Sequence, residues 1–260
     1  MEGMEHIFLA ATPAQLSAVG GYDVPVAHMA YRVGGGPHLF RSGGPVLPRG
    51  GLMVMDDVGY APGGEGEGFR DEVLRECAAR KFSGVVCRFL SPPQPTLTRA
   101  LTGLGEACRG RGMGFYVSEG YGAAVPSATV LIPTALSGGS LRGRLEEALD
   151  RFGPKRVAVW LQRVAQDFTL PSPSGSGTPL TPQELERRRQ EHGASVFFDG
   201  DLCAHYFTYM AGDRGHFILF DDAVSLRKKL ALAAELGVET AFLPYGEMED
   251  VAAGLFSGGK

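Results

Sequence analysis

The stretch FRDEVLRECAARKFSGVVCRFL, residues 69–90, places an amphipathic segment directly before a short apolar run. Within Phe69–Lys81, four apolar residues recur at the spacing of one helix face: Val73, Leu74, Cys77 and Ala78. The run that follows, Gly84–Phe89, is apolar almost throughout, as in a parallel strand that is covered on both faces. A helix joined to a buried strand in this way predicts an α/β fold with a parallel sheet.

The same pattern recurs along the chain. Seven further apolar runs are bounded by turn-forming or polar residues: His6–Ala10, Val26–Val33, Gly51–Asp56, Gly112–Val117, Thr129–Thr134, Arg156–Leu161 and Thr240–Leu243. Helical spacing also marks Leu97–Arg109, Leu141–Phe152 and Ser225–Leu236, the last with Ser225 as the expected N-cap. Eight strands with helices after most of them predict a (β/α)₈ TIM barrel, in which the first two links are too short for full helices.

Residues 172–220 interrupt this alternation between the seventh and eighth strands. Pro171–Pro179 (PSPSGSGTP) is rich in Ser, Gly and Pro and predicts an exposed, mobile loop. The sequence Thr181-Pro182-Gln183-Glu184 is typical of a helix start capped by Thr181. Three short strands are then expected, at Ser195–Phe198, Ala204–Met210 and His216–Phe220. We therefore expect one TIM-barrel domain over residues 1–260, with a mobile loop and a small antiparallel insertion within residues 172–220.

Charge and hydropathy exclude several classes of partner. The chain carries 25 Lys and Arg against 29 Asp and Glu, so a phosphate backbone is not an expected ligand. The basic run Arg187–Arg189 lies among glutamates and predicts a salt-bridged helix surface. No apolar stretch reaches the ~18 residues of a membrane span, and Met1–His6 lacks the features of a signal peptide. We therefore expect no nucleic-acid partner, no membrane partner and a cytoplasmic protein.

Motifs for metals and cofactors are not recognisable in the sequence. The four cysteines are widely spaced, which predicts buried thiols and neither a metal site nor a disulfide framework. Cys203 and His205 are close enough in sequence to form a thiol site, although packing in the core is the more ordinary role for such a cysteine. The Gly-rich segments Gly34–Gly36 and Ser137–Ser140 match no phosphate-binding loop, and Ser140 is expected to cap a helix. No cofactor is expected.

Polar and aromatic residues gather where the predicted strands end, which is where the active sites of TIM barrels lie. Seven of them are candidate ligand-binding residues: Tyr31, Asp57, Arg88, Glu119, Tyr121, Gln162 and Tyr245. Two carboxyl groups at one cleft can act as a general acid and base, and Asp56 or Asp57 with Glu119 is the candidate catalytic pair. Three structural alternatives stay open: the aspartates cap a turn, Glu119 pairs with Arg88, and the tyrosines pack at the rim.

The last quarter of the chain carries a family resemblance. His216–Ser225 (HFILFDDAVS), Lys228-Lys229, Leu236–Val238 and Phe242–Glu247 (FLPYGE) resemble the end of glycoside hydrolase family 18 barrels, the family of chitinases and spore-germination hydrolases. In that family an extended strand ends in Asp and Ser, a Lys-containing helix follows, and the last strand finishes near an aromatic residue that stacks on substrate. The resemblance implies a TIM barrel with a small α+β insertion before its last strand.

The family's catalytic signature, D-x-x-D-x-D-x-E on the fourth strand, aligns without a gap with residues 83–90. Its four acidic positions hold Ser83, Val86, Arg88 and Leu90, and Thr134 and Ala135 stand where the sixth strand commonly has Tyr-Asp. Leu90 occupies the position of the acid that protonates the leaving group. The resemblance therefore implies a barrel that binds a carbohydrate or glycan-like ligand, or a partner, without the family's hydrolysis.

Two further functions stay open at this point. A glycosidase of altered mechanism would use Glu119 with Asp56 or Asp57 as its carboxyl pair. A structural or interaction protein would use the insertion, Ser195–Phe220, as an interface. The sequence indicates neither the identity of a ligand nor an oligomeric state.

Overall fold

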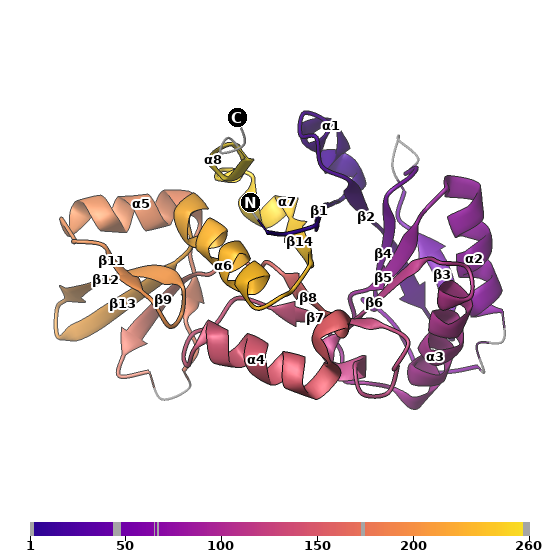
Figure 1. Cartoon of the computed structure of the whole chain (residues 1–260). Helices are drawn as coiled ribbons and strands as arrows, with labels where there is room; N and C mark the ends of the chain where they lie inside the picture. The colour runs from indigo at the N-terminus through magenta and orange to yellow at the C-terminus, as the bar shows by residue number, and fades with distance from the viewer. Residues whose placement is uncertain (1–2, 44–47, 65, 67, 173–174, 257–260) are drawn as a thin grey trace.

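Eight parallel strands form the closed barrel that the sequence predicts (Figure 1). In chain order they are β1 (His6–Ala11), β2 (Val26–Gly34), β4 (Leu52–Asp56), β5 (Gly84–Cys87), β6 (Gly114–Ser118), β7 (Thr129–Pro133), β8 (Val157–Trp160) and β14 (Thr240–Pro244). The sheet closes on itself because β1 pairs with β14 on one side and with β2 on the other. The computed structural model describes residues 3–43, 48–64, 66, 68–172 and 175–256.

Four helices cover the outside of the barrel where the sequence predicts them. They are α2 (Phe69–Arg80), α3 (Pro95–Arg109), α4 (Leu141–Phe152) and α6 (Ala223–Glu235). The predicted cap of α4 is confirmed, since the Ser140 hydroxyl accepts a hydrogen bond from the backbone N–H of Gly143 at 3.4 Å. After β14 the chain continues as two short helices, α7 (Tyr245–Met248) and α8 (Ala252–Phe256).

The start of α6 differs from the prediction in its capping residue. Asp222, not Ser225, is the N-cap, because its carboxylate accepts hydrogen bonds from the backbone N–H groups of Val224 and Ser225, both at 2.9 Å. The Ser225 hydroxyl instead donates to Asp221 Oδ1 at 2.8 Å. Asp and Ser are comparably good N-caps, so composition alone does not choose between positions three residues apart.

The first two links of the barrel are short, as predicted. Between β1 and β2 the chain forms the turn η1 (Pro13–Gln15) and the four-residue helix α1 (Leu16–Val19). After β2 it turns back as β3 (His38–Arg41), an antiparallel neighbour of β2 that the sequence analysis did not predict. Glu72 of α2 holds this hairpin, because its carboxylate accepts a hydrogen bond from the backbone N–H of Leu39 at 2.8 Å.

The insertion between β8 and β14 is a five-stranded antiparallel sheet with one helix, α5 (Pro182–Glu191). Its strands are β9 (Ala165–Leu170), β10 (Thr178–Pro179), β11 (Phe197–Asp199), β12 (Ala204–Ala211) and β13 (Arg214–Phe220). Thr181 caps α5 as predicted, through a hydrogen bond to its hydroxyl from the Glu184 N–H at 3.2 Å. Figure 1 shows the insertion at the left, on the side of the barrel opposite α2 and α3.

Two elements of the insertion differ from the sequence-based prediction. β9 was not predicted, and β10 lies within the segment predicted as a mobile loop, where it pairs with β9. Residues 173 and 174 of that loop lie outside the described residues. β9 was missed because its sequence, AQDFTL, is too polar for the near-continuous apolar pattern that marks the barrel strands.

Apolar side chains form separate layers inside and outside the barrel. The interior cluster consists of Ala10, Ala27, Leu52, Val54, Val86, Leu131, Ala158, Trp160 and Phe242. The alternation along β5 is clear, since Val86 faces this interior while Val85 and Cys87 face the helices outside. All four cysteines are buried, as predicted, and burial raises the pKa of the Cys203 thiol. A buried thiol of raised pKa is a poor nucleophile, so Cys203 is a packing residue.

A buried ion pair joins the insertion to the barrel's outer helices. Lys229 of α6 donates to Asp221 Oδ2 at 2.7 Å, and both side chains are fully buried. Asp221 follows β13, and the same oxygen accepts a hydrogen bond from the backbone N–H of Val164 at 2.9 Å. The pair therefore fixes the end of β13 against α6 and against the chain segment that leaves β8.

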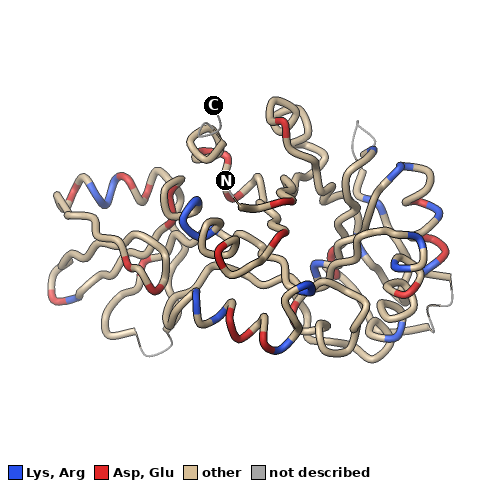
Figure 2. Tube along the Cα trace, in the orientation of Figure 1, with Lys and Arg blue, Asp and Glu red and all other residues tan. Residues whose placement is uncertain are grey.

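Acidic and basic residues occur together on the same helices, as Figure 2 shows for α4 and α5. On α5, Arg189 pairs with Glu186 at 2.7 Å and Arg187 with Glu191 at 3.6 Å, so the predicted salt-bridged surface is confirmed. Arg188 points to the sheet instead, where it pairs with Asp167. Within the described part of the chain, no helix is both long and apolar enough to cross a membrane.

Candidate functional site

A pocket of about 200 Å³ lies at the mouth of the barrel, where β5 to β8 end. Its lining residues are Arg88, Phe89, Leu90, Ser118, Glu119, Gly120, Leu131, Pro133, Trp160 and Gln162. Three of the candidate ligand-binding residues, Arg88, Glu119 and Gln162, are among them. The active sites of TIM barrels lie at this end of the barrel, beyond the carboxyl ends of the strands.

Arg88 provides the positive charge of this pocket. Its guanidinium lies over the Trp160 ring, 4.9 Å from the ring centroid. Trp160 in turn stacks on Phe242 of the neighbouring strand, and Phe242 on Phe8, with ring centroids 5.7 and 5.3 Å apart. The guanidinium makes no hydrogen bond or ion pair with any described residue. Arg88 is therefore held by an aromatic wall while its N–H donors stay available.

The positions that the family resemblance aligns with acids hold side chains with other roles. The Ser83 hydroxyl donates to the Gly51 carbonyl at 3.0 Å, and Val86 is fully buried in the barrel interior. Leu90 lies at the pocket with 68 % of its surface exposed. Thr134 is buried and donates through its hydroxyl to the Gln162 carbonyl at 3.4 Å. None of these side chains can transfer a proton as a carboxylic acid does.

Glu119 lines the pocket from the turn after β6, η2 (Glu119–Tyr121), and is the carboxylate of the site. Its carboxylate accepts a hydrogen bond from the Arg144 guanidinium of α4, and Arg151 lies 3.9 Å away. The alternative that Glu119 pairs with Arg88 is wrong, because the two arginines of α4 are its ion-pair partners. The negative charge of Glu119 is thus balanced by two arginines of α4, on the outside of the barrel.

Asp56 and Asp57 follow β4 and make local backbone contacts. Asp56 Oδ1 accepts a hydrogen bond from the Val58 N–H at 2.9 Å. Asp56 therefore caps a turn, as one of the structural alternatives expects. Asp57 is buried, and its two oxygens accept from the N–H groups of Leu90 and Ser91 at 2.9 and 3.0 Å. Neither aspartate lines the pocket with Glu119, so the structure does not bring the candidate pair together in one cavity.

The three candidate tyrosines lie outside the pocket, each at most 5 % exposed. The Tyr31 hydroxyl donates to Glu76 of α2 at 2.9 Å, and burial together with that glutamate raises the pKa of Tyr31. Tyr121 packs edge-on against Phe89, with ring centroids 5.7 Å apart, and Tyr245 packs against Tyr22. Such rings offer almost no surface on which a sugar could stack, so their placement favours the packing alternative.

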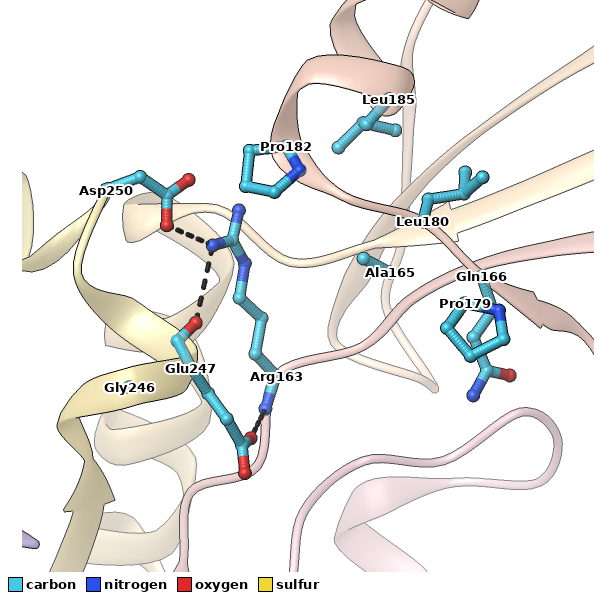
Figure 3. A pocket seen from close by; sticks show the side chains of 10 residues that line it. All are labelled: Arg163, Ala165, Gln166, Pro179, Leu180, Pro182, Leu185, Gly246, Glu247 and Asp250. Atoms are coloured by element: carbon cyan, nitrogen blue, oxygen red, sulfur yellow. Dashed lines mark hydrogen bonds and ion pairs between the residues drawn. The ribbon is translucent and has the colours of Figure 1, made fainter. Parts of the chain in front are cut away.

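A second pocket, of about 310 Å³, lies between the insertion and the segment after β14 (Figure 3). Arg163 crosses it: its Nε donates to the Asp221 carbonyl at 3.1 Å, and its Nη1 pairs with Asp250. Glu247 Oε2 accepts a hydrogen bond from the Arg163 backbone N–H at 3.1 Å. Burial raises the pKa of the Glu247 carboxyl, opposed by that hydrogen bond and by the positive charge of Arg88.

Parts of both pockets have no recognisable signal in the sequence. Trp160 forms one wall of the mouth pocket, yet in sequence it reads only as an apolar residue ending a strand. The second pocket needs Ala165 of β9, Leu180 before α5 and Leu185 within α5, and no motif connects these with the barrel rim. Among the described residues, no group of three His, Cys, Asp or Glu side chains is arranged to hold a metal ion.

Solved structures similar to this chain identify its fold, although no protein-family model and no curated protein sequence matches it. A chitinase from Chromobacterium violaceum superposes with a TM-score of 0.69 at 16 % identity, covering 97 % of this chain and 99 % of that one. The spore cortex-lytic enzyme SleL of Bacillus cereus gives 0.69 at 13 % identity, with 95 % and 72 % covered. A class V chitinase from Pseudomonas fluorescens gives 0.66 at 15 % identity, with 96 % and 97 % covered. The chain therefore has the glycoside hydrolase 18-like barrel fold that is found in chitinases and SleL-type spore cortex-lytic enzymes.

Proposed function

We propose that this barrel binds a carbohydrate in the mouth pocket and does not catalyse the hydrolysis of glycosidic bonds by the family 18 mechanism. The observation that carries the proposal is Leu90, an alkyl side chain at the rim position that the resemblance aligns with the proton-donating acid. Its neighbour in the signature, Arg88, brings a positive charge where the aligned residue is an Asp. An oxocarbenium-like transition state is not stabilised by a guanidinium.

General acid catalysis contributes about 10²–10⁴-fold to a rate, and an alkyl side chain supplies none of it. The other carboxylates near the mouth are already engaged: Asp57 by two backbone N–H groups, and Glu119 by Arg144 and Arg151. We therefore expect turnover to be lost while the pocket remains.

Binding is supported by the composition of the pocket wall. An apolar wall with a few polar groups is the usual construction of a small-ligand site, and Leu90, Pro133, Gln162 and Arg88 provide these components. Its volume of about 200 Å³ is below the ~300–1,000 Å³ of pockets for drug-sized ligands. The pocket is thus suited to one ring of a glycan, with the remainder outside the barrel.

The test measures binding and turnover on the same preparation. We expect a glycan array and calorimetry to detect saccharide binding, while oligomers of N-acetylglucosamine release no new reducing ends. A chitinase assayed in parallel is the positive control for turnover. Hydrolysis that follows this protein through successive chromatography steps would overturn the proposal, as would the absence of any glycan ligand. If turnover appears and Glu119→Gln removes it, the glycosidase of altered mechanism is the correct function.

A further inference from the structure

We propose that the saccharide bound in the mouth pocket carries a carboxylate, and that Arg88 is the residue that recognises it. This inference rests on the proposed function, because it specifies the chemical class of the same ligand. It starts from an imbalance in the pocket: a guanidinium lines a cavity and has no acceptor among the described residues.

The geometry of Arg88 leaves its hydrogen-bonding edge open. A guanidinium is planar and carries five N–H donors around its edge. Its central carbon lies 4.9 Å from the centroid of the Trp160 ring, and its donors have no acceptor among the described residues. The backbone N–H of Arg88 donates to the Met55 carbonyl at 2.9 Å, so the residue is anchored through its main chain while its side-chain donors are unused. The matching partner for such an edge is a carboxylate, which accepts two parallel hydrogen bonds.

The charges around the pocket favour an anion over a neutral sugar. Glu119 is the carboxylate in the lining, and Arg144 and Arg151 already face it. Glu247 lies in the field of Arg88 but accepts its hydrogen bond from Arg163, and its burial disfavours the ionised form. Arg88 is therefore the charged residue of the pocket lining that has no ion-pair partner among the described residues, although the chain as a whole carries a net charge of −4. An unpaired cation in a cavity favours ligands of opposite charge.

A second unsatisfied donor lies behind the guanidinium. The indole Nε1–H of Trp160 is buried and has no hydrogen-bond partner. Of the two unpaired donor groups in this wall, the Arg88 guanidinium is the one that lines the pocket, and a ligand group that only accepts would satisfy it. The remaining wall, which includes Leu131 and Pro133, is apolar and suits the C–H face of a pyranose ring. A pyranose with one carboxylate combines both requirements.

The experiment compares matched pairs of sugars that differ in the carboxylate. Calorimetry would measure glucuronate against glucose, where the carboxylate is on the ring, and N-acetylmuramate against N-acetylglucosamine, where it is on an ether substituent. We expect the acidic member of at least one pair to bind more tightly by about ten-fold or more, with affinity falling as salt rises. The pair that shows this preference identifies the position of the carboxylate.

Variants of Arg88 separate charge recognition from general loss of the site. Arg88→Met should weaken binding of the acidic sugar by about ten-fold or more while the neutral sugar changes by less than about two-fold. Arg88→Lys keeps the charge but lacks the planar guanidinium. Its affinity for the acidic sugar should therefore lie between that of wild type and that of Arg88→Met. Arg142→Met is the matched control, because Arg142 is an exposed arginine of α4 that pairs with Glu235 at 2.9 Å.

The outcomes distinguish this inference from the proposed function. If acidic and neutral sugars bind equally and Arg88→Met weakens both equally, the carboxylate inference is wrong and glycan binding stands. If the acidic preference survives in Arg88→Met, another residue recognises the anion and the assignment to Arg88 is wrong. If none of the four sugars binds to the wild-type protein while the glycan array shows a neutral ligand, this inference is wrong and glycan binding stands. If the array also shows no ligand, the proposed function fails as well.

Discussion

Asp57, directly after β4, accepts a hydrogen bond at 2.9 Å from the backbone N–H of Leu90, in the segment that follows β5. A second bond, from Ser91 at 3.0 Å, occupies the other oxygen of the same carboxylate. A buried acid of the barrel mouth therefore positions the segment that carries Leu90. A carboxylate near a cleft is not by itself a catalytic group, because its oxygens can be fully used by the backbone.

Replacing Asp57 should destabilise the fold at this rim. Asp57→Ala removes the charged acceptor of two hydrogen bonds and leaves the Leu90 and Ser91 N–H groups without a partner. We therefore expect the free energy of unfolding to fall by about 1.5–3 kcal/mol. Urea denaturation would measure it. Asp56→Ala is the control, since Asp56 makes a single turn hydrogen bond and should cost about 1 kcal/mol or less. Equal losses in the two variants would contradict the positioning role.

The buried pair of Lys229 and Asp221 gives a larger expected effect. Lys229→Met keeps the volume of the side chain but leaves the Asp221 carboxylate buried without its cation, and we expect a loss of about 3–5 kcal/mol. Lys228→Met is the matched control. Its ammonium lies over the Phe198 ring, 3.7 Å from the centroid, and should contribute about 0.5–1 kcal/mol. A Lys229→Met protein as stable as the control would show that the pair adds nothing to the fold.

Glu247 should make stability depend on pH. Burial raises the pKa of its carboxyl above the ordinary value of 4.5. At a pH between the ordinary pKa and the raised pKa, the folded chain therefore binds a proton that the unfolded chain has released. Stability contributed by the protonated form is present at low pH and is lost as the pH rises through this window.

The substitution that tests this is Glu247→Gln, which keeps the acceptor for the Arg163 N–H and removes the titration. Its stability relative to wild type should increase as the pH is raised from about 4 to about 8 in urea unfolding experiments. Glu249→Gln removes one carboxylate at an exposed neighbouring position and is the matched control. A Glu247→Gln curve that runs parallel to wild type would show that the Glu247 carboxyl titrates alike in both states.

The strands and helices of the barrel could be predicted because their side chains are sorted by burial. Val85, Val86 and Cys87 are buried on both faces of one strand, and a short continuous apolar run of this kind is typical of the parallel strands of an α/β fold. The strands of the insertion have one face turned to solvent or to α5. Their apolar pattern is weaker for that reason, and β9 was missed.

The candidate site was predicted in part, and Tyr31 shows why the remainder was not. Arg88, Glu119 and Gln162 line the pocket because they directly follow strand ends, which sequence can locate. Tyr31 lies on β2, where the pairing with β4 shifts register between Met29 and Tyr31. The irregularity turns Tyr31 outward to Glu76, while Met29 packs against the barrel interior. A one-residue shift reverses the face of a side chain, and the residue types of β2 do not indicate where it occurs.

Val86 packs inside the barrel against an apolar cluster, and this limits how the chain can change by mutation. An Asp at that position would place an unpaired charge in the interior, at a cost of several kcal/mol out of the about 5–15 kcal/mol that stabilises a typical domain. A Glu in place of the exposed Leu90 would be tolerated, but alone it would lack its partner acids. An acid on the interior face of β5 would therefore harm the fold, even though an acid at the exposed rim would not. The apolar interior makes acidic substitutions at the inward-facing positions of this strand unfavourable.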